Sequence, residues 1–152
     1  MIEIRRAVSS DLDDVLPLIA EFYEADAHSF DLSRVQAGLR PLLADDAVGQ
    51  VWVAQDTMGA VSLVGYAVVT WSWSLESGGR DCLLDEIYVR LRGEGIGGRL
   101  LHHAMTEAQV AGCASMFMET EAPNDQARAF YARHGFSVED SVWMGRDLVD
   151  GA

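Results

Sequence analysis

A glycine-rich turn joins an apolar, strand-like run to an amphipathic helix in the second half of the chain. Residues 92–98 read RGEGIGG, and residues 82–89 before them read CLLDEIYV. After the turn, apolar residues recur every three to five positions, as on the buried face of a helix: Ile96, Leu100, Leu101, Ala104, Met105 and Ala108. The backbone N–H groups of such a turn point into one space at the positive end of the helix dipole. We therefore expect a ligand that carries a phosphate or pyrophosphate group.

The length and composition predict one soluble α/β domain over residues 1–152. With 152 residues, 49% of them hydrophobic, the chain can bury a core, and no apolar run approaches membrane-spanning length. The first residues lack the basic-then-apolar layout of a signal peptide. Cys82 and Cys113 lie in apolar segments, which favours buried, reduced thiols over a disulfide or metal pair. These features indicate a cytoplasmic protein.

The charge of the chain excludes several function classes. A formal net charge of −13 disfavours binding to nucleic acid or anionic membranes and favours cationic small molecules. All eleven basic residues are arginine. The absence of lysine removes a Walker A site, a pyridoxal-phosphate Schiff base and a lysine nucleophile. None of the histidines is accompanied by other metal-ligating residues at a suitable spacing, so no metal is expected.

The order of elements predicts a mixed sheet of about seven strands with helices on its faces. Helices are expected from Asp11, where Pro17 should kink or split the first one, over 32–43, from the glycine turn to Gly112, and from Asn124 to Gly135. The predicted strands are 2–6, 51–55, 61–73, 82–89, 115–120, 136–138 and 142–148.

The glycine pattern also fits a dinucleotide-binding protein. Gly93, Gly95 and Gly98 satisfy G-x-G-x-x-G, and Glu119 stands where a ribose-binding acid would be expected. The context argues against it, because the preceding strands resemble an antiparallel meander and only 54 residues follow Gly98. A dinucleotide-dependent oxidoreductase is therefore the third alternative.

Including Arg92 gives a more specific pattern, because Arg92-x-x-Gly95-x-Gly97 matches the signature of the GNAT superfamily of N-acetyltransferases. The chain resembles this family from Ile4 to Leu148. Further motifs follow in the family's order: Ile4-Arg5-Arg6-Ala7 with Asp11-Leu12, residues 84–89, and Asn124 with Phe130-Tyr131 and Gly135-Phe136. The connection from Val89 to Arg92 is two residues shorter than is usual in the family. The resemblance implies a mostly antiparallel sheet, splayed between its fourth and fifth strands, and acetyl-CoA as co-substrate.

By resemblance, the donor site is built largely from backbone. The implied contacts are Arg92, Gly93, Glu94, Gly95, Ile96, Gly97 and Gly98 at the pyrophosphate, Ile87, Tyr88 and Val89 along the pantetheine arm, and Asn124 and Tyr131. The arm would pair with its strand like an added strand, and an amide near Val89 would face the thioester oxygen. Asn124 could cap its helix, bind the cofactor, or do both.

The resemblance assigns Tyr131 the role of general acid toward the departing thiolate. The alternative is a core tyrosine with a satisfied hydroxyl. Glu86 is the first choice as base or water relay, with Asp85 and Glu119 as competing carboxylates on the acceptor side. Adjacent strand residues face opposite sides, so the pleat alone cannot aim Asp85 and Glu86 at one ligand. An ion pair with Arg80 is the structural alternative for these acids.

Several aromatic residues could form a wall for a cationic acceptor, although packing in the core explains them equally well. They are Tyr23, His28 and Phe30, between the first two helices, and Trp71 and Trp73, on one face of a strand.

The sequence thus predicts an N-acetyltransferase that uses direct attack in a ternary complex. The expected acceptor is a primary amine of a small, cationic molecule, or else a protein N-terminus. The alternative from another functional class is a non-catalytic protein of the same fold that binds acyl-CoA as a sensor. A homodimer is left open, and neither nucleic acid nor a membrane is an expected partner.

Overall fold

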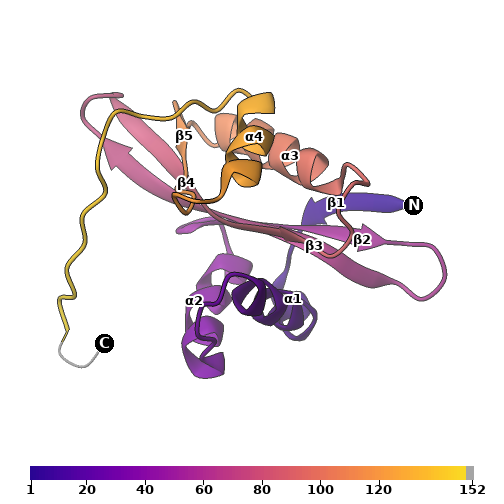
Figure 1. Cartoon of the computed structure of the whole chain (residues 1–152). Helices are drawn as coiled ribbons and strands as arrows, with labels where there is room; N and C mark the ends of the chain where they lie inside the picture. The colour runs from indigo at the N-terminus through magenta and orange to yellow at the C-terminus, as the bar shows by residue number, and fades with distance from the viewer. Residues whose placement is uncertain (150–152) are drawn as a thin grey trace. The chain divides into compact units, whose positions relative to one another are not determined.

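The computed structural model describes residues 1–149, so the end of the predicted domain, 150–152, lies outside the described residues. The chain divides into two compact units, Met1–Glu119 and a second unit from Thr120 onward, which are taken separately below. The first unit contains the sheet and three of the helices (Figure 1). Up to residue 149, the second contains one helix, which is followed by a segment without helix or strand.

The sheet has five strands that follow one another in space as they do in sequence: β1 (Ile2–Arg6), β2 (Gly49–Asp56), β3 (Ser62–Ser74), β4 (Gly79–Val89) and β5 (Met116–Phe117). The first four pair antiparallel, and β5 pairs parallel to β4. β5 meets β4 only at Cys82 and Leu83. From Leu84 to Val89, the edge of β4 away from β3 therefore has no partner strand among the described residues.

Helices cover both faces of the sheet, as predicted (Figure 1). A 3₁₀ turn (η1, Ser9–Asp11), α1 (Leu12–Ala25) and α2 (Leu32–Ala44) lie on one face, and α3 (Ile96–Val110) lies on the other. Pro17 does not split α1, contrary to one expectation. Asp13 and Pro17 are both exposed, so the carbonyl that loses its helical donor faces water.

The core explains why these helices dock where they do. Apolar side chains of α1 and α2 pack with inward residues of the sheet; the fully buried ones are Val15, Leu18, Val51, Val53 and Tyr66. On the opposite face, α3 buries Leu100, Leu101 and Ala104. Cys82 is buried and Cys113 is half-buried, and both are free thiols. No helix among residues 1–149 is long and apolar enough to cross a membrane.

The prediction of about seven strands is wrong, since residues 1–149 form a sheet of five. Within the predicted fifth strand, 115–120, only two residues pair, and residues 136–149 form no strand. Alternating apolar residues make a strand only where a neighbouring backbone accepts their hydrogen bonds. Here the apolar side chains of the segment are largely exposed: Val138, Val142, Trp143, Met144 and Leu148.

Candidate active site

The glycine turn is an exposed loop whose backbone only glycine adopts readily. Gly93 and Gly95 have φ of 82° and 75°, in the left-handed region, and Gly95 caps the N-terminus of α3. Ile96 is buried and anchors the helix, whereas Arg92 and Glu94 are exposed. The first amides of α3 have no carbonyl within the helix to bind. The turn is therefore suited to a diphosphate.

The end of β4 leads directly into this turn. Ile87, Tyr88 and Val89 pair with β3 along one edge, and their other edge lacks a partner strand among the described residues. An extended amide chain such as pantetheine could add to that edge. Just beyond, Arg90 binds the carboxylate of Glu21 through Nε and Nη2, at 3.0 and 2.6 Å, and so ties the strand end to α1.

A β-bulge lies at the middle of β4. Leu84 is opposite Val69 and Glu86 is opposite Val68, so Asp85 is an extra residue without a partner on β3. A bulge breaks the simple alternation of side chains. Burial is the main cause of the raised pKa values of Glu86 and of two nearby tyrosines, and the negative charge of Asp85 raises them further. The bulge therefore removes the strict alternation that the pleat alone would give to Asp85 and Glu86.

Glu86 is held between two tyrosine hydroxyls. Tyr66 Oη on β3 donates to Oε1 at 2.8 Å, and Tyr23 Oη on α1 donates to Oε2 at 2.6 Å. Burial raises the pKa of Glu86 above its usual value, while the hydrogen bonds from the two hydroxyls lower it by a smaller amount. Burial also raises the pKa of Asp85. A carboxylate with a raised pKa and fixed orientation is a suitable general base.

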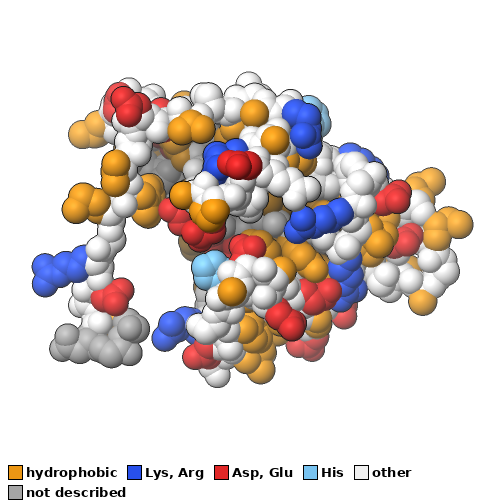
Figure 2. Space-filling model, in the orientation of Figure 1, with side chains coloured by type: hydrophobic (Ala, Val, Ile, Leu, Met, Phe, Trp, Pro, Cys, Tyr) orange, Lys and Arg blue, Asp and Glu red, His pale blue; other side chains and the backbone are white. Residues whose placement is uncertain are grey.

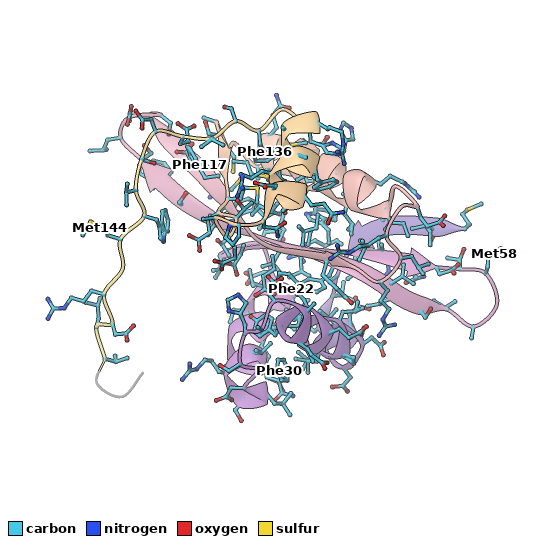
Figure 3. The ribbon with its side chains drawn as sticks, viewed as in Figure 1. Phe22, Phe30, Met58, Phe117, Phe136 and Met144 are labelled. Carbon is cyan, nitrogen blue, oxygen red and sulfur yellow. The ribbon has the colours of Figure 1, made fainter. Side chains whose placement is uncertain are left out.

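Three of the predicted aromatic residues gather beside Glu86. The ring of Tyr23 meets those of His28 and Phe30 edge-on, with centroids 6.4 and 5.9 Å apart. Tyr23 also contacts Phe22, which lies between α1 and the sheet (Figure 3). Since His28 and Phe30 are exposed, this cluster borders solvent.

The two tryptophans are not part of this cluster. Trp71 and Trp73 pair with Cys82 and Arg80, toward the far end of β4 from Glu86. The Arg80 guanidinium lies 5.2 Å from the centre of the Trp71 ring and donates to the Ala111 carbonyl, so it is engaged away from the carboxylates. Glu119 is exposed, two residues beyond β5.

In the second unit, Tyr131 lies on α4 (Asp125–Arg133). Asn124 caps this helix, its Oδ1 accepting from the Ala127 N–H at 3.0 Å. The helix stops before Gly135, as predicted, and Gly135 has φ of 91°. Gly135 N–H donates to the Ala132 carbonyl and Phe136 N–H to the Tyr131 carbonyl, which together form a Schellman motif.

The sequence reasoning missed Tyr66. It lies within an apolar run and reads as core, and its ring is indeed completely buried. A signal was available, because a buried tyrosine hydroxyl needs a hydrogen-bond partner. The sequence does not reveal the strand register, which is needed to identify Glu86 as that partner. Among residues 1–149, no group of three or more His, Cys, Asp or Glu side chains could hold a metal.

A glycine turn beside an open strand edge is an arrangement suited to an acyl carrier that contains a diphosphate, as acyltransferases require. The acetyltransferase (GNAT) family model matches residues 12–136, and the chain belongs to this family. It is therefore an acyltransferase of a family that uses acetyl-CoA as co-substrate.

Individual relatives agree with this assignment. An uncharacterized N-acetyltransferase, YhfO, of Bacillus subtilis is 27% identical over 138 residues, which cover 90% of each chain. The fold is shared with a possible acetyltransferase from Clostridium difficile 630, at a TM-score of 0.85, 22% identity and coverage of 98% and 99%. It is also shared with an aminoglycoside acetyltransferase from an uncultured soil metagenomic sample, solved in complex with sisomicin, at a TM-score of 0.76, 19% identity and coverage of 97% and 96%.

Proposed function

We propose that this enzyme transfers the acetyl group of acetyl-CoA to a primary amine of a small, cationic molecule. The observation that carries the proposal is the Glu86 carboxylate, fixed by two tyrosine hydroxyls on a strand whose outer edge is open. A base of this kind is needed because an alkylammonium has a pKa of about 10 and is mostly protonated at neutral pH.

The donor is held by backbone groups in this proposal. Amides of residues 93–98 bind the diphosphate, with the positive end of α3 behind them, and Arg92 adds charge at the exposed rim. The pantetheine arm pairs with the free edge of Ile87, Tyr88 and Val89. An amide of that stretch donates to the thioester oxygen as negative charge develops there.

The reaction is a direct attack in a ternary complex. Glu86 accepts a proton from the acceptor ammonium, directly or through a water, and the free amine forms the new N–C bond as the C–S bond breaks. Tyr131 gives a proton to the departing sulfur, and the acylated nitrogen passes its remaining extra proton through water to the Tyr131 phenolate. Glu86 then releases the ammonium proton to solvent, so one proton is released for each amide formed. A covalent route through Cys82 is disfavoured, because burial raises the pKa of that thiol to about 12.

The cationic acceptor is supported by charge and by aromatic surface. The chain has a net charge of −13, and several acidic side chains lie over α1 on the face drawn in Figure 2. Glu86 lies beside the Tyr23, His28 and Phe30 cluster, to which it is joined by the Tyr23 hydroxyl, so a cation finds a carboxylate and aromatic rings there. An aminoglycoside acetyltransferase shares the fold, and aminoglycosides are small polycationic amines.

The test is an acetyl-CoA assay that reads out free thiol with a panel of amines. The panel contains an aminoglycoside, a polyamine, an amino acid, an aromatic amine and a short peptide with a free N-terminus. Turnover of a small cation supports the proposal, whereas turnover of the peptide alone would assign a protein N-terminus as acceptor. Binding of acetyl-CoA without turnover of any amine would indicate a sensor.

A further inference from the structure

The two hydroxyls that hold Glu86 stand in different surroundings. Tyr66 is completely buried, and its position on β3 is fixed between Val53 on β2 and Tyr88 on β4. Tyr23 is half-buried on α1, and its ring touches the exposed His28 and Phe30. One oxygen of Glu86 is therefore bound from the core, and the other from the side that borders solvent.

Both hydroxyls act as donors to an ionised Glu86. Burial, followed by the hydrogen bond and the charge of Glu86, raises the pKa of Tyr23 well above its usual value. Burial and the charge of Glu86 do the same for Tyr66. Phenols with raised pKa values remain protonated at neutral pH, so each supplies one O–H to the carboxylate. The groups that act on the pKa of Glu86 are these two tyrosines, Asp85 and His28. Tyr88, a further titratable group, lies on β4 with its ring centre 6.4 Å from that of Tyr66.

We infer that Tyr66 is a positioning residue that anchors Glu86 by Oε1, and that Tyr23 occupies Oε2 until an acceptor ammonium displaces it. This inference rests on the proposed function, because it assigns the acceptor to the oxygen that Tyr23 covers. An ammonium is a stronger partner for a carboxylate than a neutral phenol, so the exchange is favourable. Tyr66 cannot be displaced in the same way, because no solvent or substrate reaches a side chain that is 0% exposed.

The two tyrosines consequently have different mutant phenotypes. Tyr66→Phe removes a donor that water cannot replace, so the ionised form of Glu86 is less stable. We expect the acidic limb of kcat/KM to move to higher pH by about one unit, the equivalent of one net hydrogen bond. Tyr23→Phe removes the competitor at Oε2, where water can enter. We expect a small shift of the limb and an acceptor KM lower by about three- to tenfold.

The experiment compares wild type, Tyr66→Phe, Tyr23→Phe and Val53→Ala from pH 5 to 9. Val53 is the buried neighbour of Tyr66 on β2, and it has no polar side-chain atom. Val53→Ala therefore reproduces a loss of core packing without removing a donor, and we expect it to lower the melting temperature and leave the acidic limb in place. If the acidic limb of kcat/KM moves equally in Val53→Ala and Tyr66→Phe, the positioning role of Tyr66 is wrong.

A second readout does not depend on turnover. Carbon-13 NMR of glutamate-labelled protein follows the resonance of the Glu86 carboxyl. This resonance is assigned because it is missing from the spectrum of Glu86→Gln. Its titration midpoint should rise in Tyr66→Phe. An unchanged midpoint in folded Tyr66→Phe overturns the inference even if wild type is active. If Tyr66→Phe does not fold, the buried Tyr66 hydroxyl proton decides the matter in wild type. It should appear at low field and shift in Glu86→Gln, and a resonance insensitive to Glu86 overturns the anchor. If wild type acetylates no amine, the proposed function is wrong, but the NMR experiment still tests whether Tyr66 positions Glu86.

Discussion

The ring of Phe136 packs edge-on against the ring of Tyr131, with centroids 5.7 Å apart, while the Phe136 N–H donates to the Tyr131 carbonyl at 3.1 Å. The contact is part of the Schellman motif that ends α4, and Gly135 makes it possible by adopting φ of 91°. The Gly-Phe pair of the family motif thus fixes the backbone and ring of the proposed general acid.

Replacing that hydroxyl tests the role of Tyr131. Tyr131→Phe keeps the ring contacts with Phe130 and Phe136. We expect kcat to fall by about 10²- to 10⁴-fold, the usual contribution of a general acid. The dissociation constant for acetyl-CoA, measured by calorimetry, should stay the same, because the proposed donor contacts are largely backbone. An unchanged kcat would show that Tyr131 is a structural tyrosine and not the general acid.

The left-handed glycines allow a matched test of the diphosphate site. Gly95 and Gly78 have φ of 75° and 80°, and a Cβ at either position meets no atom within 4 Å. Alanine at either should therefore cost about 1–2 kcal/mol of backbone strain, seen as similar losses in thermal stability. Only Gly95→Ala should weaken binding of acetyl-CoA, since Gly78 lies in the turn between β3 and β4. Equal donor affinity in the two variants would contradict the assignment of the turn.

The raised pKa of Glu86 predicts opposite effects of pH on activity and on stability. As a base, Glu86 must be ionised, so kcat/KM should fall as pH drops through its raised pKa, and Glu86→Gln should abolish this limb. A folded-state pKa above the unfolded value means that ionisation costs stability. Wild type should therefore lose stability relative to Glu86→Gln as pH rises through the same interval. Urea denaturation at several pH values measures this difference, and parallel pH profiles for the two proteins would refute it.

Asp11 predicts the opposite dependence on pH. Its carboxylate is nearly buried and accepts two hydrogen bonds from Arg5, at 2.8 and 2.9 Å, and one from the Val8 N–H. The hydrogen bond from Arg5 lowers the pKa of Asp11 more than burial raises it. The stability it contributes is thus present above the usual carboxyl pKa and is lost as pH falls through the lowered value.

Asp11→Asn should accordingly lower the free energy of unfolding at pH 7 by about 1–3 kcal/mol. The value is modest because the Arg5 side chain is 36% exposed and water screens the pair. The deficit should shrink toward pH 3 in urea denaturation. Glu76→Gln, at the exposed turn between β3 and β4, is the control and should change stability by less than about 0.5 kcal/mol. A deficit that is equal at both pH values would show that charge is not involved.

The local signals in the sequence located most elements. The apolar spacing after Ile96 predicted α3, Gly135 marked the end of α4, and the glycine-rich run 92–98 marked the turn between β4 and α3. These features follow from contacts within a few residues along the chain. Strand-like alternation was less reliable, because residues 136–149 have the pattern and form no strand. Pairing depends on a second backbone that the pattern does not specify.

The sequence by itself determined the family, the glycine turn, the covered sheet and the candidacy of Glu86, since all of these depend on local spacing and residue type. Only the tertiary structure decided how Glu86 is held. The bulge at Asp85 and the hydroxyls of Tyr23 and Tyr66 reach it from residues one, 63 and 20 positions away. Such contacts arise from strand register and helix docking, which are set by packing of the whole core rather than by any segment of the sequence.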